Sequence, residues 1–128
     1  MMTFEKIQLA QRKIRQKALR RDLKKAAAQV KHWEDEVALA GKEVDAAKER
    51  LVHFLDRLNA TETLWRRLRA ADSFIHAHQR RITEAYARKD RAWSMLTRAN
   101  ESVIAMCGLQ HENLLRILHW KRELGRYK

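Results

Sequence analysis

Apolar residues recur at alternating intervals of three and four along most of this sequence, and this heptad spacing constrains the fold more than any other feature. Spacing of this kind, sustained over several heptads, is typical of a coiled-coil helix. The first series is Leu23, Ala26, Val30, Trp33, Val37, Ala40, Val44, Ala47, Leu51, Phe54 and Leu58. The second is Leu68, Ala71, Ile75, His78, Ile82, Ala85, Lys89, Ala92, Leu96, Ala99, Val103 and Met106.

The two series do not share a register, so the stretch between them contains either a stutter in one helix or a loop. That stretch reads "LNATETLW" from Leu58 to Trp65. Asn59 tolerates the left-handed conformation that ends helices, and Thr61 or Thr63 can cap a following helix. We therefore predict an all-α fold, a long two-helix antiparallel coiled-coil hairpin forming a single domain over residues 1–128. Its expected elements are a helix at about 3–58, a turn at about 59–63 and a helix at about 64–126.

A symmetry argument supports the turn. If residue i lies opposite residue 122 − i, every a position of one helix meets a d position of the other, as Val44 does with His78. Near the N-terminus this register predicts that the apolar seam changes face. It would then consist of Phe4, Ile7, Gln11 and Ile14 on the first helix, opposite Leu118, Leu115, His111 and Gly108 on the second.

Composition limits the partners and the compartment. The net charge is +12, which favours an acidic partner such as nucleic acid, an anionic membrane surface or a protein with an acidic cavity. The one cysteine, Cys107, cannot form an internal disulfide, which indicates a reducing compartment. We find no run of 18 apolar residues and no signal peptide, so we expect a cytoplasmic protein with no membrane span.

The sequence carries no motif for catalysis, cofactor binding or metal binding. It has no glycine-rich phosphate loop, no His-Glu-x-x-His and no paired cysteines. Cys107 and His111 are four residues apart and could form half of a metal site, but no third ligand accompanies them. His78 falls on the seam, where a core histidine is the simpler interpretation. We expect no enzymatic activity, because a two-helix hairpin offers no concave pocket.

Three surfaces are candidates for binding. The first is the basic run "RKIRQKALRRDLKK" (residues 12–25), which could also be a solvated face. The second is "WRRLR" (residues 65–69), just after the turn, although Trp65 could instead pack at the tip. The third is an apolar stripe near the C-terminus that includes Ile117, Trp120 and Leu124. These three residues, rather than Leu115 and Leu118, could instead complete the seam, and the spacing alone does not decide. In either case the end with both termini has surplus apolar surface, which favours a partner there.

The opening "FEKIQLAQRKIRQKALRRDL" (residues 4–23) is an apolar pair followed by closely spaced basic residues. Together with the expected hairpin, it resembles the central stalk family of type III secretion systems, the FliJ-like flagellar and YscO-like injectisome components. The resemblance implies a non-enzymatic, monomeric protein at the cytoplasmic side of the inner-membrane secretion apparatus. Its implied partners are the hexameric ring of the secretion ATPase, the cytoplasmic domain of the export gate and export chaperones.

Position in the hairpin then selects candidate contact residues. The candidates that would face the ATPase are Ile7, Arg12, Lys13, Arg15, Arg20, Arg21, Ile117, Trp120 and Leu124. The candidates at the tip, for contact with the gate, are Trp65, Arg66, Arg67 and Arg69.

Two other classes of function remain open on the sequence. One is a basic coiled coil that binds nucleic acid, against which residues 33–62 carry four Lys and Arg but eight Asp and Glu. The other is a secretion chaperone or scaffold that makes no contact with an ATPase.

Overall fold

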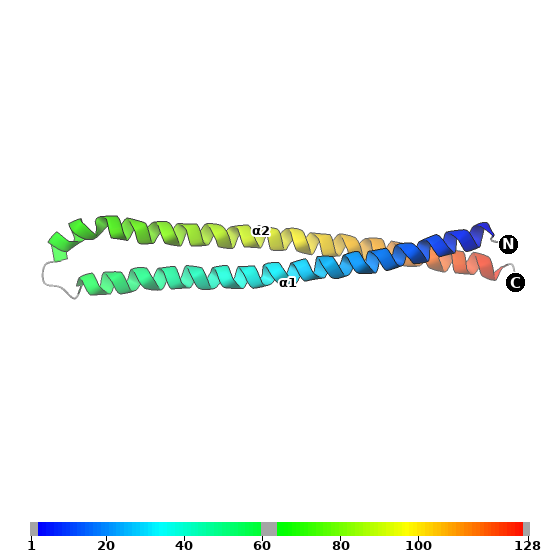
Figure 1. The fold of residues 1–128 in the computed structure, drawn as a ribbon, viewed down its shortest axis with the longest axis horizontal. Helices are drawn as coiled ribbons and strands as arrows, with labels where there is room; N and C mark the ends of the chain where they lie inside the picture. The colour runs from blue at the N-terminus through cyan, green and yellow to red at the C-terminus, as the bar shows by residue number, and fades with distance from the viewer. Residues whose placement is uncertain (1–2, 60–63, 127–128) are drawn as a thin grey trace. The chain divides into compact units, whose positions relative to one another are not determined.

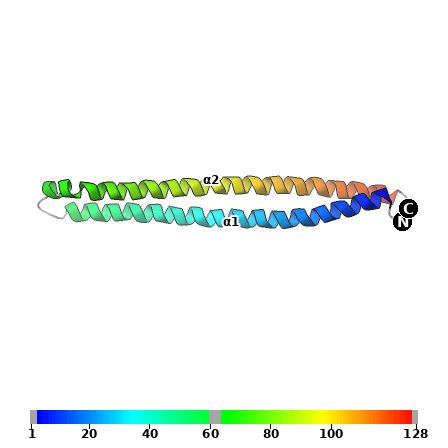
Figure 2. The same cartoon turned by 45° about the horizontal axis from the view of Figure 1, so that its top comes forward.

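The chain folds into two long α-helices that pack against each other as an antiparallel hairpin. The computed structural model describes residues 3–59 and 64–126, and for residues 59 and 64–71 it describes the backbone alone. Helix α1 is Phe4–Asn59 and helix α2 is Leu64–Gly125. They run in opposite directions, as two views show (Figure 1 and Figure 2). The described residues form no strand, and the predicted fold class is confirmed.

Local chemistry accounts for the helices and for the start of α1. The chain has no proline, and Thr3 lies just before α1. The Thr3 hydroxyl accepts a hydrogen bond from the backbone N–H of Lys6 at 3.3 Å, which satisfies a donor that the first turn leaves unpaired. Asn59 ends α1 with a helical backbone, and no described residue has a left-handed φ. Thr61 and Thr63, the expected caps of α2, lie outside the described residues.

The helices meet along one seam of heptad positions a and d. Positions e and b lie on one side of it and positions g and c on the other, while f faces away from the partner helix. Near the chain ends the buried and half-buried seam residues are Leu9, Arg12, Gln16 and Leu19 on α1 with Gln110, Asn113, Ile117, Trp120 and Leu124 on α2.

The hairpin divides into two units. Unit 1 is Met1–Lys31 with Thr97–Lys128, and unit 2 is His32–Leu96. Each unit therefore contains one segment of α1 and one of α2.

Unit 2 has a narrow core in which small residues dominate. Among its residues with described side chains, the buried ones are Ala40, Val44, Ala47, Ala85, Ala92 and Leu96. Flanking contacts identify the two sides of the seam. Glu43 and Arg88, both at g, form a salt bridge of 3.4 Å, and Lys48 lies 4.9 Å from the centre of the Tyr86 ring, with both residues at e. Pairing of g with g and e with e is the pattern of an antiparallel coiled coil.

Unit 1 combines apolar and polar seam residues. Leu19, Ala99 and Ile117 are buried there. Between them, Asn113 donates hydrogen bonds from Nδ2 to Oε1 of Gln16 (2.9 Å) and to the backbone carbonyl of Arg12 (3.0 Å). At the chain ends the rings of Phe4 and Trp120 meet edge to face, with their centres 5.7 Å apart. Burying two neutral amides is tolerated because they satisfy part of each other's hydrogen-bonding capacity.

The predicted register is wrong by about one heptad. The relation i to 122 − i places Gln16 opposite Met106, whereas Gln16 contacts Asn113, seven residues further along. It also pairs Val44 with His78, whereas the half-buried ring of His78 lies 5.3 Å from that of Phe54. A slip of one heptad keeps every a opposite a d, so the apolar pattern cannot distinguish the two registers.

The predicted change of face near the chain ends is also wrong. Ile14 is 70 % exposed and Leu115 is 53 % exposed, so neither belongs to the seam. The alternative that Ile117, Trp120 and Leu124 complete the seam is the observed one. The prediction failed because the seam positions after Met106 are occupied by the polar residues Gln110 and Asn113. A search for apolar residues alone therefore ends the a/d series at Met106.

Candidate partner-binding surface

Nearly all of the excess positive charge lies in unit 1. This unit holds 16 Lys and Arg against 5 Asp and Glu, a balance of +11, whereas unit 2 holds 12 against 11, a balance of +1. The two balances make up the net charge of +12. An acidic partner is therefore attracted to the unit that contains both chain ends.

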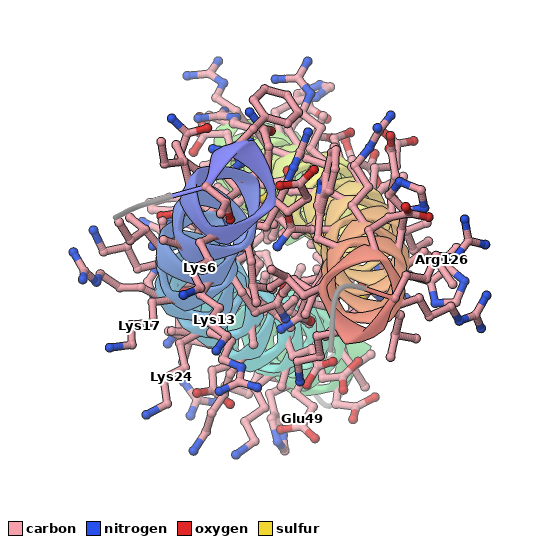
Figure 3. The ribbon with its side chains drawn as sticks, turned by 90° about the vertical axis from the view of Figure 1, so that its right-hand side faces the viewer. Lys6, Lys13, Lys17, Lys24, Glu49 and Arg126 are labelled. Carbon is pink, nitrogen blue, oxygen red and sulfur yellow. The ribbon has the colours of Figure 1, made fainter. Side chains whose placement is uncertain are left out.

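The basic residues of α1 form an ordered stripe along one side of the helix. Figure 3 shows Lys6, Lys13, Lys17 and Lys24 together on one side of α1. These lysines occupy positions e and b, as do Arg20 and Lys31, and all six side chains are exposed. We call these six residues the lysine stripe. It is a solvated surface whose charges remain available to a ligand.

A second stripe, which is apolar, follows one side of α2 in the same unit. Ile104 is 72 % exposed, Leu114 is 41 % exposed and Leu118 is 50 % exposed. Together with the exposed Cys107 and His111 they occupy successive b and e positions. We call these five residues the leucine stripe. Exposed apolar side chains gathered in this way are characteristic of an interaction surface.

The two stripes lie on the same flank of unit 1. Both occupy b and e, and in an antiparallel pair the e positions of the two helices share one side of the seam. The side chains of Arg20 and Lys24 line a shallow hollow of about 500 Å³ together with Leu23 and Gln110, which belong to the seam. The flank thus presents basic groups from α1 beside apolar groups from α2.

Of the nine residues predicted to face the ATPase, five are exposed and four are buried or half-buried at seam positions. Ile7, Lys13, Arg15, Arg20 and Arg21 are exposed on α1 in unit 1. Arg12 is half-buried at a seam position, and its backbone carbonyl accepts the hydrogen bond from Asn113.

The other three do not form a free apolar face, and that prediction is wrong. Ile117 is only 7 % exposed, and Trp120 and Leu124 are half-buried. All three fall on the a/d positions that pack against α1. Surplus apolar surface is nevertheless present in unit 1, as predicted, but it comes from Ile104 and from the leucines at 114, 115 and 118.

The predicted tip contacts lie outside what the structure describes in atomic detail. Trp65, Arg66, Arg67 and Arg69 belong to the first turns of α2, where only the backbone is described. Their role in contacting an export gate stays a prediction.

The described residues hold no cluster of three potential metal ligands, and Cys107 with His111 remains a pair. Among the same residues, no helix is long and apolar enough to cross a membrane. The chain matches no protein-family model, no curated protein and no solved structure.

Sequence reasoning missed the leucine stripe as a surface because it assigned two of its members, His111 and Leu118, to the interior. The sequence signal that predicts this surface is the continuity of the a/d series along α2. The a/d series of α2 continues past Met106 in unbroken steps of three and four through Gln110, Asn113 and Ile117. Accepting two amides in the seam leaves the remaining leucines of this segment on the outside.

Proposed function

We propose that this protein is a non-enzymatic stalk or linker of a type III protein-secretion apparatus, and that unit 1 inserts into the ring of the export ATPase. The observation that carries the proposal is the concentration of charge and exposed apolar side chains in unit 1. It holds +11 of the net charge and also the exposed Ile7, Ile14 and Leu118. An acidic pore attracts the basic groups, and the apolar side chains set the affinity once they are desolvated.

The architecture suits a linker. In an α-helical hairpin the backbone hydrogen bonds are satisfied within each helix, so the surface presents only side chains to a partner. Each unit has its own packed core, and the exposed residues of unit 1 can change without loss of that core. In this proposal residues 65–69 contact the cytoplasmic domain of the export gate, and the hairpin can also hold export chaperones.

Under the proposal the protein works in the cytoplasm at the inner face of the membrane that holds the secretion apparatus, as a monomer. Its contribution is mechanical coupling between ATPase and gate. The resemblance of residues 4–23 to the stalk family supports this interpretation, as does the agreement between the expected hairpin and the observed one.

Affinity capture from the cells that encode the protein tests the proposal. The full chain is used as bait at low and moderate salt, with and without nuclease. We expect recovery of a hexamer-forming ATPase that does not depend on nucleic acid. Recovery of nucleic acid instead, lost with nuclease and steeply reduced by salt, would support a nucleic-acid-binding coiled coil and overturn the stalk.

Two charge-reversal variants localise the contact. In unit 1, Lys13, Arg20 and Lys24 are changed to Glu; in unit 2, Lys42, Arg80 and Arg81 are changed in the same way. All six side chains are exposed, so both variants retain their seams and have the same altered net charge. We expect the first variant to lose the ATPase and the second to retain it. Equal loss of ATPase recovery from both variants would mean that binding depends on the net charge of the chain and not on the position of the charges.

A further inference from the structure

We propose that the flank of unit 1 formed by the lysine and leucine stripes binds an amphipathic α-helix of another protein, whose apolar stripe is bordered by Asp and Glu. The bound helix would lie along the hollow between α1 and α2 and make a third member of the coiled coil. This inference goes beyond the proposed function, because it requires neither an ATPase nor a secretion apparatus.

The spacing of the leucine stripe points to a helical occupant. Its members are Ile104, Cys107, His111, Leu114 and Leu118, in steps of three and four residues. This is the spacing with which a helix presents side chains to another helix, and here it recurs on a flank that faces no element of the described chain.

The charges on the same flank specify an acidic occupant. None of the five acidic residues of unit 1 lies at b or e, since they occupy c, d, f or g. Asp22, Glu112 and Glu123 all belong to the opposite flank. The lysine stripe, in contrast, places a cation at six positions between residues 6 and 31. The flank therefore attracts anionic side chains along its whole length and repels basic ones.

The two stripes are close enough to act on one ligand. Arg20 and Lys24 from the lysine stripe share the hollow with Gln110, which sits one helical turn from the Leu114 side chain. A helix resting there contacts the leucine stripe with its apolar residues. Its acidic border on the α1 side then faces the lysine stripe.

A second copy of the chain is a poorer match. Its unit 1 has the same excess of positive charge, and its unit 2 carries almost no net charge. Residues 33–62 of its unit 2 do carry eight Asp and Glu against four Lys and Arg, but the apolar a and d residues of that segment are already packed in its own seam. We therefore assign the flank to a different protein.

The experiment uses the full chain and a designed probe, a four-heptad helical peptide with leucine at its core positions and glutamate beside them. Cys107 lies within the leucine stripe and is exposed, so its rate of alkylation reports occupation of this flank. We expect saturable binding of the peptide and slower alkylation of Cys107. A matched peptide with lysine in place of glutamate should do neither.

Variants with matched controls make the test specific. Leu114→Ser with Leu118→Ser should weaken binding at least about tenfold, whereas Leu109→Ser, an exposed leucine on the opposite flank, should have little effect. Reversal of Lys13, Lys17 and Lys24 to Glu should also abolish binding. The control for that variant reverses Arg15, Lys25 and Arg98, three exposed cations at g and c.

Four outcomes would overturn the inference. They are absence of binding, equal binding of the lysine peptide, equal loss in the control variants, and binding only to anionic phospholipid vesicles. Concentration-dependent self-association that protects Cys107 without any peptide would instead assign the flank to a second copy. Failure of this test leaves capture of the ATPase unaffected, so the two proposals can fail separately.

Discussion

The Asn113 side chain donates a 2.9 Å hydrogen bond to Oε1 of Gln16 across the seam of unit 1, and a second one to the backbone carbonyl of Arg12. Gln16 and Asn113 are both buried. Gln16 Nε2 and Asn113 Oδ1 have no hydrogen-bond partner among the described residues, so this layer is only partly satisfied. A polar layer of this kind specifies register at a cost in stability.

The first prediction concerns that cost. The double variant Gln16→Leu, Asn113→Leu should be as stable as the parent or up to about 2 kcal/mol more stable, because both polar partners are removed together. Gln16→Leu alone should lose about 1–3 kcal/mol, because it leaves the Asn113 amide buried with one partner fewer. Urea unfolding followed by circular dichroism measures both. A double variant that loses as much as the single one would contradict this account of the layer.

The second prediction concerns register. In a Cys107→Ser background, cysteines at 16 and 113 should form a disulfide within one chain, because these side chains meet in the structure. Cysteines at 16 and 106, the pair given by the symmetric register, should remain reduced under the same conditions. Mass spectrometry of the non-reduced monomer distinguishes them. Preferential linkage of 16 to 106 would restore the register predicted from the apolar pattern.

The third prediction concerns the glycines inside the helices. Gly41 and Gly108 have no positive φ, and a Cβ added at either would meet no atom within 4 Å. Gly41→Ala and Gly108→Ala should therefore each raise the free energy of unfolding by about 1 kcal/mol through helix propensity alone. Thermal unfolding at matched protein concentration tests each variant separately. Destabilisation by either would mean that the glycine has a role that this structure does not show.

The fourth prediction concerns pH. The side-chain hydrogen bond with Tyr86 raises the pKa of Lys48, and Coulombic interaction with Tyr86 and with Asp45 acts in the same direction. A lysine with a raised pKa in the folded state stabilises the fold below its unfolded pKa of about 10.4 and loses that effect as pH rises through the folded pKa. Lys48→Gln should therefore lower Tm slightly at pH 9, and the difference should shrink as the pH rises through the raised pKa of the folded state. Lys42→Gln, at an exposed site, is the control.

The heptad series made the hairpin predictable. The run from Leu23 to Leu58 and the second run from Ile75 to Met106 both lie at seam positions of the described helices, and the break between the two series falls where α1 gives way to α2. The two helices and the break between them can be predicted because they depend only on the spacing of apolar residues along each helix, which is read directly from the sequence. The charge imbalance of unit 1 could likewise have been counted from the sequence once the hairpin had been drawn.

The register and the exposed leucines could not be predicted in the same way. Pairing Val44 with His78 satisfies the a/d rule as well as the observed pairing does, because a slip of seven residues changes no heptad position. Leu115 and Leu118 have the same interval of three as Ile117 and Trp120. Ile117 and Trp120 belong to the seam only if the seam also accepts the amides of Gln110 and Asn113. Asn113 is accepted there because Gln16 is its hydrogen-bond partner on α1. Only the paired helices contain this information.

The measurement that tests the central claim most directly is a lysine-modification footprint of the protein bound to its captured partner. The acetylation rates of Lys13, Lys17 and Lys24 in unit 1 are compared with that of Lys42, an exposed lysine in unit 2. If unit 1 is the binding unit, the three lysines are protected in the complex while Lys42 reacts at its free rate. Protection of Lys42 with unchanged reactivity at 13, 17 and 24 would contradict the account and move the binding site to unit 2.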